Sequence, residues 1–94
     1  MDPLATRTLG RTGVALTQLG FGGAPLGELF TRVSEEDATA TLQAAWDAGL
    51  RYYDTAPWYG RGQSEHRVGR FLYRRPRRDL VLSTKVGRVF RAPR

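Results

Sequence analysis

The chain has 94 residues, of which 40% are hydrophobic, and a formal net charge of +6. This length allows one domain, residues 1–94, with a modest core, and the composition is that of a globular rather than a disordered chain. The sequence has no run of about 18 apolar residues, no secretory signal and no cysteine. We therefore expect a cytoplasmic protein without a membrane span, a disulfide or a thiolate metal site.

The N-terminal third predicts a hairpin followed by a strand. Short apolar and β-branched segments, 6–9 and 14–16, flank the glycine-bounded turn 10–13, which is the pattern of a β-hairpin. Residues 16–21 are expected to continue as a buried strand that breaks at Gly22 and Gly23, and residues 24–33 to form a loop.

A helix and a second strand follow. Ser34 precedes three acidic residues, which predicts an N-cap and a first helical turn. Apolar side chains then recur at helical spacing until Gly49, which is expected to end the helix; they are Ala38, Leu42, Ala45 and Trp46. The aromatic segment 50–53 is too short for a helix, so it predicts a strand whose C-terminal end is Asp54.

A second helix and a third strand complete the predicted elements. After a loop over 55–63, Ser64 is expected to cap a helix. Its apolar face holds Val68, Phe71 and Leu72, and its arginines point elsewhere: Arg67, Arg70 and Arg74. Residues 80–84 predict a core strand that ends at Lys85. Strands alternating with helices indicate right-handed crossovers and a parallel sheet, so the fold class is α/β.

Two charged residues are expected to meet at one edge of this sheet. Asp54 and Lys85 are 31 residues apart, about one βαβ unit. Each ends a strand, and α/β proteins place their chemistry at the carboxyl ends of strands. Lys85 is also the only lysine in a chain with fourteen arginines, which indicates a position that needs a compact ammonium group.

Tyr59 lies five residues after Asp54, in the segment DTAPWYG. A phenol is a weak acid, with an unperturbed pKa of about 10, but a neighbouring ammonium stabilises its anion. Tyr59, Lys85 and Asp54 can therefore form a set that delivers a proton to a carbonyl oxygen. The alternative from spacing alone is structural: an Asx turn at Asp54, a loop aromatic at Tyr59 and an ordinary ion pair.

The segment DTAPWYGRGQSEHRVGRFL, preceded by DAGLRYY and followed by LVLSTKVG, resembles the aldo-keto reductase family from about residue 9 to 88. The resemblance implies the N-terminal part of a (β/α)8 barrel that stays incomplete in this chain. Within the family, GGAPLG, YDTAPWYG and LSTKVGR are similar to the branch of dehydrogenases that handles D-threo-aldoses, L-fucose or pyridoxal.

The resemblance also implies roles for particular residues. Tyr59 would be the general acid or base, Lys85 the cation that stabilises its anion, and Asp54 the partner of Lys85. The cofactor would be NADP or NAD, approached by the backbone of Gly22, Gly23 and Ala24 and by Asp54. Trp58 would line the pocket of a small carbonyl or sugar substrate.

The sequence departs from the family in two ways. The family's catalytic histidine has no counterpart, because the one histidine, His66, falls near the start of the second predicted helix and is expected to be a surface residue. The family's main cofactor contacts lie in the C-terminal half of the barrel, so nothing here selects NAD or NADP. We therefore expect a truncated chain that is inactive alone and unstable or self-associating, because three strands do not close a barrel.

Two other function classes stay open. The first is a remnant of the barrel that binds a cofactor or a partner without chemistry. The second is nucleic-acid binding through the arginine run 74–78, although such a run between a helix and a strand is more often a solvated turn.

Overall fold

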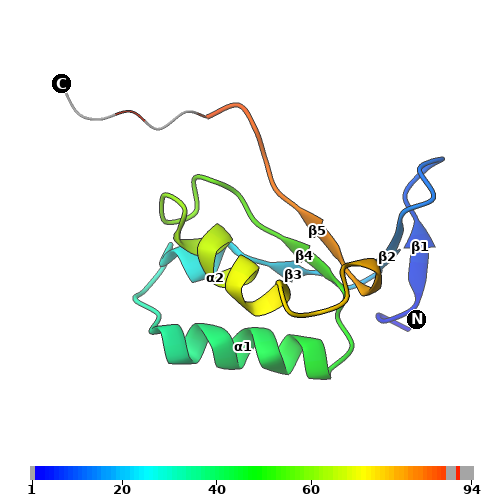
Figure 1. The fold of residues 1–94 in the computed structure, drawn as a ribbon, viewed down its shortest axis with the longest axis horizontal. Helices are drawn as coiled ribbons and strands as arrows, with labels where there is room; N and C mark the ends of the chain where they lie inside the picture. Colours follow the sequence, from blue (N-terminus) through cyan, green and yellow to red (C-terminus); the bar gives the residue numbers. More distant parts are fainter. Residues whose placement is uncertain (1, 89–90, 92–94) are drawn as a thin grey trace.

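The computed structural model describes residues 2–88 and 91. Its parallel sheet has the strand order β3-β4-β5, formed by Phe21–Gly22, Tyr52–Asp54 and Val81–Ser83. Two α-helices, α1 (Glu35–Asp47) and α2 (Gln63–Leu72), connect these strands and pack against each other, and an N-terminal hairpin lies to one side of the sheet (Figure 1). The predicted order of a hairpin and then parallel strands with intervening helices is confirmed.

The hairpin consists of β1 (Thr6–Thr8) and β2 (Ala15–Thr17), paired antiparallel with Thr6 opposite Thr17. Gly10 and Gly13 both have positive φ angles, 55° and 76°, which only glycine adopts at low cost. The glycine-bounded turn predicted from the sequence is therefore confirmed.

The strand predicted over residues 16–21 is wrong in its extent. The backbone amides of Gln18 and Leu19 donate to carbonyl oxygens of Ala5 and Pro3, so this segment is held by the N-terminus instead of by the sheet. Residues 18–20 are exposed, and the strand of the parallel sheet, β3, begins only at Phe21.

Helix α1 forms as its sequence predicts. The Ser34 hydroxyl accepts a hydrogen bond of 3.0 Å from the Asp37 amide, which satisfies one of the free amides of the first turn. Ala38 and Leu42 are each 1% exposed. Burying a leucine side chain contributes about 1.5–3 kcal/mol, so this face anchors the helix.

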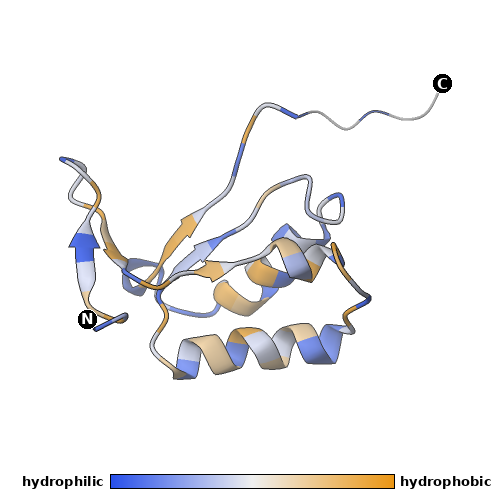
Figure 2. Cartoon of the chain, turned by 180° about the vertical axis from the view of Figure 1, so that it is seen from behind, coloured by the Kyte–Doolittle hydropathy of each residue, from blue (hydrophilic) through white to orange (hydrophobic). Residues whose placement is uncertain are grey.

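The core lies between the helices and the sheet. Figure 2 shows apolar colour on both helices and on β5, whereas β1 is polar. Tyr53 is fully buried at the centre, with its ring 5.5 Å from that of Phe21 and 6.4 Å from that of Trp46. Its hydroxyl donates to the Leu50 carbonyl at 3.1 Å, so the buried phenol is satisfied.

Helix α2 differs from the prediction at its start. It begins at Gln63 and is capped by Gly62, whose φ of 101° is left-handed. Ser64, predicted as the cap, instead lies inside the first turn and is 0% exposed. Its hydroxyl donates to the Gly23 carbonyl at 2.7 Å, so Ser64 ties the helix to the sheet instead of capping it.

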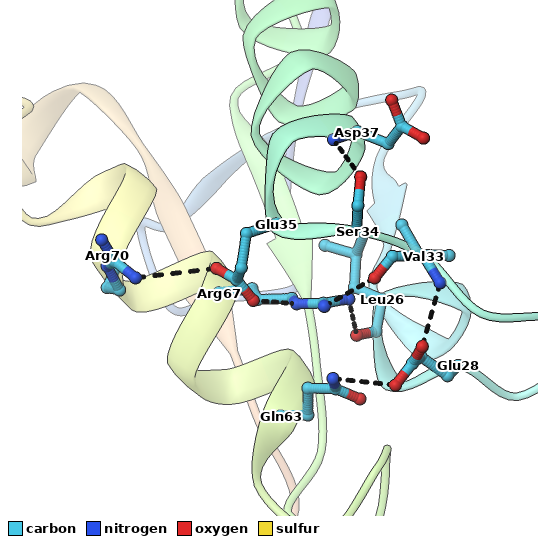
Figure 3. A network of polar contacts seen from close by, with 9 residues as sticks. All are labelled: Leu26, Glu28, Val33, Ser34, Glu35, Asp37, Gln63, Arg67 and Arg70. Atoms are coloured by element: carbon cyan, nitrogen blue, oxygen red, sulfur yellow. Dashed lines mark hydrogen bonds and ion pairs between the residues drawn. The ribbon is translucent and has the colours of Figure 1, made fainter.

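The prediction for Arg67 is also wrong. Its side chain is buried (6% exposed), as are those of Val68 and Phe71 in the same helix. Its guanidinium donates to the Leu26 and Val33 carbonyls, at 3.0 and 2.6 Å. Its Nε forms an ion pair with Glu35 at 2.6 Å (Figure 3). A buried arginine is tolerated here because each of its three guanidinium nitrogens donates to an acceptor.

The loop predicted over residues 24–33 contains a short 3-10 helix, Ala24–Gly27. Glu28 then accepts from the Gln63 side chain at 2.9 Å and from the Val33 amide at 3.0 Å, as Figure 3 shows. Together with Arg67, these contacts fasten the segment between β3 and α1 onto α2.

The arginine run forms a turn, as predicted, with a 3-10 helix at Arg77–Asp79. Two of its guanidiniums donate to main-chain carbonyls: Arg75 to that of Phe71 and Arg77 to that of Leu80. The Arg75 guanidinium also stacks 3.6 Å from the centroid of the Phe71 ring. Within the described part of the chain, no helix has the length and apolarity needed to cross a membrane.

Candidate active site

Asp54 and Lys85 meet at the carboxyl edge of the sheet. Strand β4 ends at Asp54, which lies opposite Ser83, the last residue of β5. Lys85 then reaches back, and its Nζ donates to Asp54 Oδ2 at 2.7 Å and to the Thr55 carbonyl at 3.0 Å. The proximity predicted from their spacing of 31 residues is confirmed.

The two charges stabilise each other. The hydrogen bond to Asp54 raises the pKa of Lys85 above its usual value, opposed by partial burial and assisted by the Asp54 charge and by Tyr59. Burial by itself raises the pKa of Asp54, but hydrogen bonds from Lys85 and Ser83, with the Lys85 charge, outweigh it and lower that pKa. Both groups are therefore held in their ionised forms.

Tyr59 and Trp58 lie beside this pair. The Lys85 ammonium is 5.2 Å from the centroid of the Tyr59 ring, within the range of a cation–π contact. Trp58 is 50% exposed, and the Arg88 guanidinium lies 5.1 Å from the centroid of its ring. These side chains line a cavity of about 250 Å³ together with Ala56, Pro57 and Val86.

Close backbone packing fixes the loop that carries Tyr59. A Cβ atom added at Gly27 would lie 2.3 Å from the Tyr59 carbonyl carbon and 2.5 Å from the Gly60 nitrogen. The 3-10 helix after β3 therefore touches the main chain of Tyr59 with no space for a side chain. The contacts of Glu28 and Arg67 described above hold that 3-10 helix in place.

Gly22, the last residue of β3, and Gly23, which follows it, differ in their surroundings. A Cβ atom at Gly22 would have no atom within 4 Å, so this backbone is open to a ligand. A Cβ atom at Gly23 would lie 2.7 Å from the Ser64 hydroxyl oxygen and 2.8 Å from the Asp54 carbonyl oxygen. Gly23 is thus required by packing within the chain, whereas Ala24 is half-buried in the 3-10 helix.

Sequence reasoning missed two groups of the site. The Ser83 hydroxyl donates to Asp54 Oδ1 at 2.6 Å, and the Thr55 carbonyl accepts from Lys85. Ser83 precedes Lys85 by two residues in LSTK, so alternation along the strand that was predicted to end at Lys85 places both side chains on the same side. That alternation was the signal that could have identified it.

His66 is exposed on α2, as predicted. Among the described residues, no group of three or more acidic, histidine or cysteine side chains is placed to hold a metal ion.

A model of the aldo/keto reductase family matches residues 18–93. The chain belongs to this family. The resemblance predicted from DTAPWYG and LSTKVG is therefore confirmed, and the parallel strands with their helices superpose on part of the (β/α)8 barrel of aldo-keto reductases. The described residues form three parallel strands and no closed barrel.

Two curated aldo-keto reductase relatives match most of the chain. D-threo-aldose 1-dehydrogenase from Pseudomonas sp is 56% identical over 79 residues, which cover 84% of this chain and 24% of the relative. Pyridoxal 4-dehydrogenase from Microbacterium luteolum is 55% identical over 83 residues, which cover 88% and 24%. The chain thus spans about a quarter of the length of these relatives.

Solved aldo-keto reductase structures superpose on the same region. A holo-form enzyme from Bacillus halodurans matches with a TM-score of 0.81 and 34% identity, covering 93% of this chain and 27% of that chain. An aldo-keto reductase from Klebsiella pneumoniae in complex with NADPH matches with a TM-score of 0.68 and 32% identity. The match covers 87% of this chain and 28% of that chain.

Proposed function

We propose that residues 1–94 form the N-terminal portion of the domain of an NAD(P)-dependent oxidoreductase that acts on an aldehyde, a ketone or an aldose. The observation that supports this most is the Lys85–Asp54 ion pair beside the Tyr59 ring, at the carboxyl edge of a parallel sheet. The names of the relatives at 55–56% identity favour an aldose or pyridoxal as the substrate class.

Three side chains would handle the proton. In reduction, the Tyr59 hydroxyl gives its proton to the carbonyl oxygen, and in oxidation the phenolate takes a proton from the alcohol. The Lys85 ammonium stabilises the phenolate, and Asp54 holds Lys85 in its charged form, consistent with the raised pKa of Lys85. The ammonium reaches the tyrosine ring while it is still bound to the carboxylate.

The open backbone at Gly22, next to Asp54 across the sheet, fits a nicotinamide cofactor at this edge. Gly23 and Ala24 would contribute main-chain surface, since neither has a long side chain. When bound, the nicotinamide supplies or accepts the hydride. Trp58 would form an apolar wall of the cavity in front of Tyr59, against which a sugar or an aromatic aldehyde can pack.

The test is a chimera, because three strands do not close a barrel and we expect the 94 residues by themselves to be inactive. The stretch of D-threo-aldose 1-dehydrogenase that matches this chain is replaced by the residues of this chain. Oxidation of aldoses and reduction of aldehydes are followed by the absorbance of the reduced nicotinamide. We expect turnover by the chimera, and its loss in Tyr59→Phe.

Tyr73→Phe is the matched control, because Tyr73 is 69% exposed at the C-terminal end of α2 and its hydroxyl accepts a hydrogen bond from the neighbouring Arg74. This variant should keep the turnover of the chimera. A folded chimera without turnover, or a Tyr59→Phe variant with full turnover, would contradict the proposed function.

A further inference from the structure

The first turn of α2 is bonded to the ends of all three parallel strands. The Ser64 hydroxyl donates to the carbonyl of Gly23, the residue after β3, at 2.7 Å. The same hydroxyl lies 2.7 Å from that of Thr55, the residue after β4. Glu65 accepts a hydrogen bond of 2.6 Å from Thr84, the residue after β5.

The side chains of Ser64 and Thr55 are buried where they meet the Gly23 main chain. Ser64 is 0% and Thr55 3% exposed, and the Gly23 amide also donates to the Asp54 carbonyl at 2.8 Å. The space beside Gly23 is filled by Ser64 and by the Asp54 main chain. In a buried, close-packed network, a displaced hydroxyl has no alternative partner.

Two residues around Lys85 are bonded to this turn. One acceptor of its ammonium is the Thr55 carbonyl, and the side chain of Thr55 is held by Ser64. The residue before Lys85 is Thr84, whose hydroxyl is held by Glu65. Ser64 therefore holds the residue whose carbonyl accepts from Lys85, and Glu65 holds the residue that precedes Lys85.

We propose that Ser64 and Glu65 are positioning residues of the active site: together they set the distance between the Lys85 ammonium, Asp54 and the backbone at Gly23. This inference rests on the proposed function for its catalytic meaning. The positioning itself is a property of the chain and is measured without turnover.

A merely structural role would look different. The Thr84–Glu65 bond is exposed, and exposed polar contacts add little to stability. Breaking the Thr84–Glu65 bond should leave the fold intact whether Glu65 is a structural or a positioning residue. Only if Glu65 is a positioning residue should the loss of this bond also change the ionisation of Lys85. The ionisation of Lys85 therefore separates the two roles.

The experiment uses the single lysine of the chain. Growth with ¹³C-labelled lysine gives one Cε resonance, whose shift against pH reports the Lys85 titration midpoint directly. We expect the wild-type midpoint to lie above that of free lysine, and Thr84→Val and Ser64→Ala to move it toward that of Asp54→Asn. Thr84→Ser, which keeps the hydroxyl, should retain the wild-type midpoint.

Thr41→Val is the matched control. Thr41 makes a hydrogen bond of 2.7 Å to the Asp37 carbonyl on the exposed side of α1, so the same substitution is made far from Lys85. Its titration should equal that of the wild type. Circular dichroism of the helices verifies that each variant is folded. If Ser64→Ala unfolds the chain, the Lys85 titration of Thr84→Val, which breaks the contact with Glu65, tests the proposal.

The proposal is overturned if folded Thr84→Val titrates like the wild type, or if the wild-type midpoint is no higher than that of free lysine. In the chimera, Thr84→Val should also lower kcat by up to about 100-fold, as a misplaced catalytic group does, with a smaller change in KM. A chimera without turnover but with the expected lysine titrations would refute the proposed function and leave the positioning standing.

Discussion

The buried arginine of α2 gives the sharpest stability prediction. Arg67 and Arg70 both contact the Glu35 carboxylate (Figure 3), but the Arg67 side chain is 5% exposed and that of Arg70 66%. Replacing each by methionine keeps an apolar side chain and removes the guanidinium. The pair of variants therefore compares the same change at a buried and an exposed position of one ion-pair network.

The magnitude for Arg67→Met follows from its two bonds to main-chain carbonyls, of Leu26 and Val33. A polar group that loses its partner on the inside of a protein costs about 1–3 kcal/mol, so two such carbonyls give a loss of about 2–6 kcal/mol. For a domain of this size, 1 kcal/mol corresponds to about 4–8 °C in Tm. Arg67→Met should therefore lower Tm by at least about 8 °C.

Arg70→Met should be indistinguishable from the wild type, because the Arg70 pair is exposed and spans 3.6 Å. Thermal and urea unfolding followed by circular dichroism measure both variants, at several chain concentrations so that any association is seen. Equal midpoints for the two variants would refute the argument that the carbonyl bonds of Arg67 hold the segment between β3 and α1.

Urea unfolding tests two glycines of the chain. Gly27→Ala should destabilise the chain by about 1–3 kcal/mol, because the added methyl group would meet the Tyr59 main chain. Gly69→Ala places its methyl group in open space on α2, so it should stabilise the chain by about 0.5–1 kcal/mol. The lowered pKa of Asp54 gives stability that is present above the usual carboxyl pKa and lost as pH falls through the lowered value. The raised pKa of Lys85 gives stability that is present below the usual lysine pKa and lost as pH rises through the raised value, so Asp54→Asn should flatten the pH dependence at both ends. The 94-residue chain should self-associate through the edges of β3 and β5, which pair with no further strand of the described residues. A sedimentation coefficient that stays constant with concentration would contradict this.

The sequence predicted the parts of the site that depend on strand periodicity. Asp54 and Lys85 end neighbouring parallel strands, and a βαβ unit of ordinary length places them at one edge, where they form an ion pair. The cap of α1 was equally local, because Ser34 and the amide it binds are three residues apart. Sequence patterns within one βαβ unit or one helical turn were therefore sufficient to predict the Asp54–Lys85 pair and the Ser34 cap.

The sequence did not predict contacts whose partners are distant. Two acceptors of Arg67 are carbonyls 41 and 34 residues away, so the sequence pattern placed this arginine off the apolar face of the helix. Ser64 was interpreted as a helix cap for the same reason, although its partner is the Gly23 carbonyl, also 41 residues away. Polar side chains satisfied by remote main-chain atoms leave no periodic signal.

The choice of lysine at position 85 has a physical basis in this geometry. The ammonium binds two acceptors of adjacent residues, Asp54 Oδ2 at 2.7 Å and the Thr55 carbonyl at 3.0 Å, and still lies 5.2 Å from the Tyr59 ring centroid. A compact tetrahedral group can point separate donors at all three, whereas a planar guanidinium directs its donors within one plane. The chain has fourteen arginines and one lysine. The lysine lies where a planar cation would lose its contact either with the Asp54 carboxylate or with the Tyr59 ring.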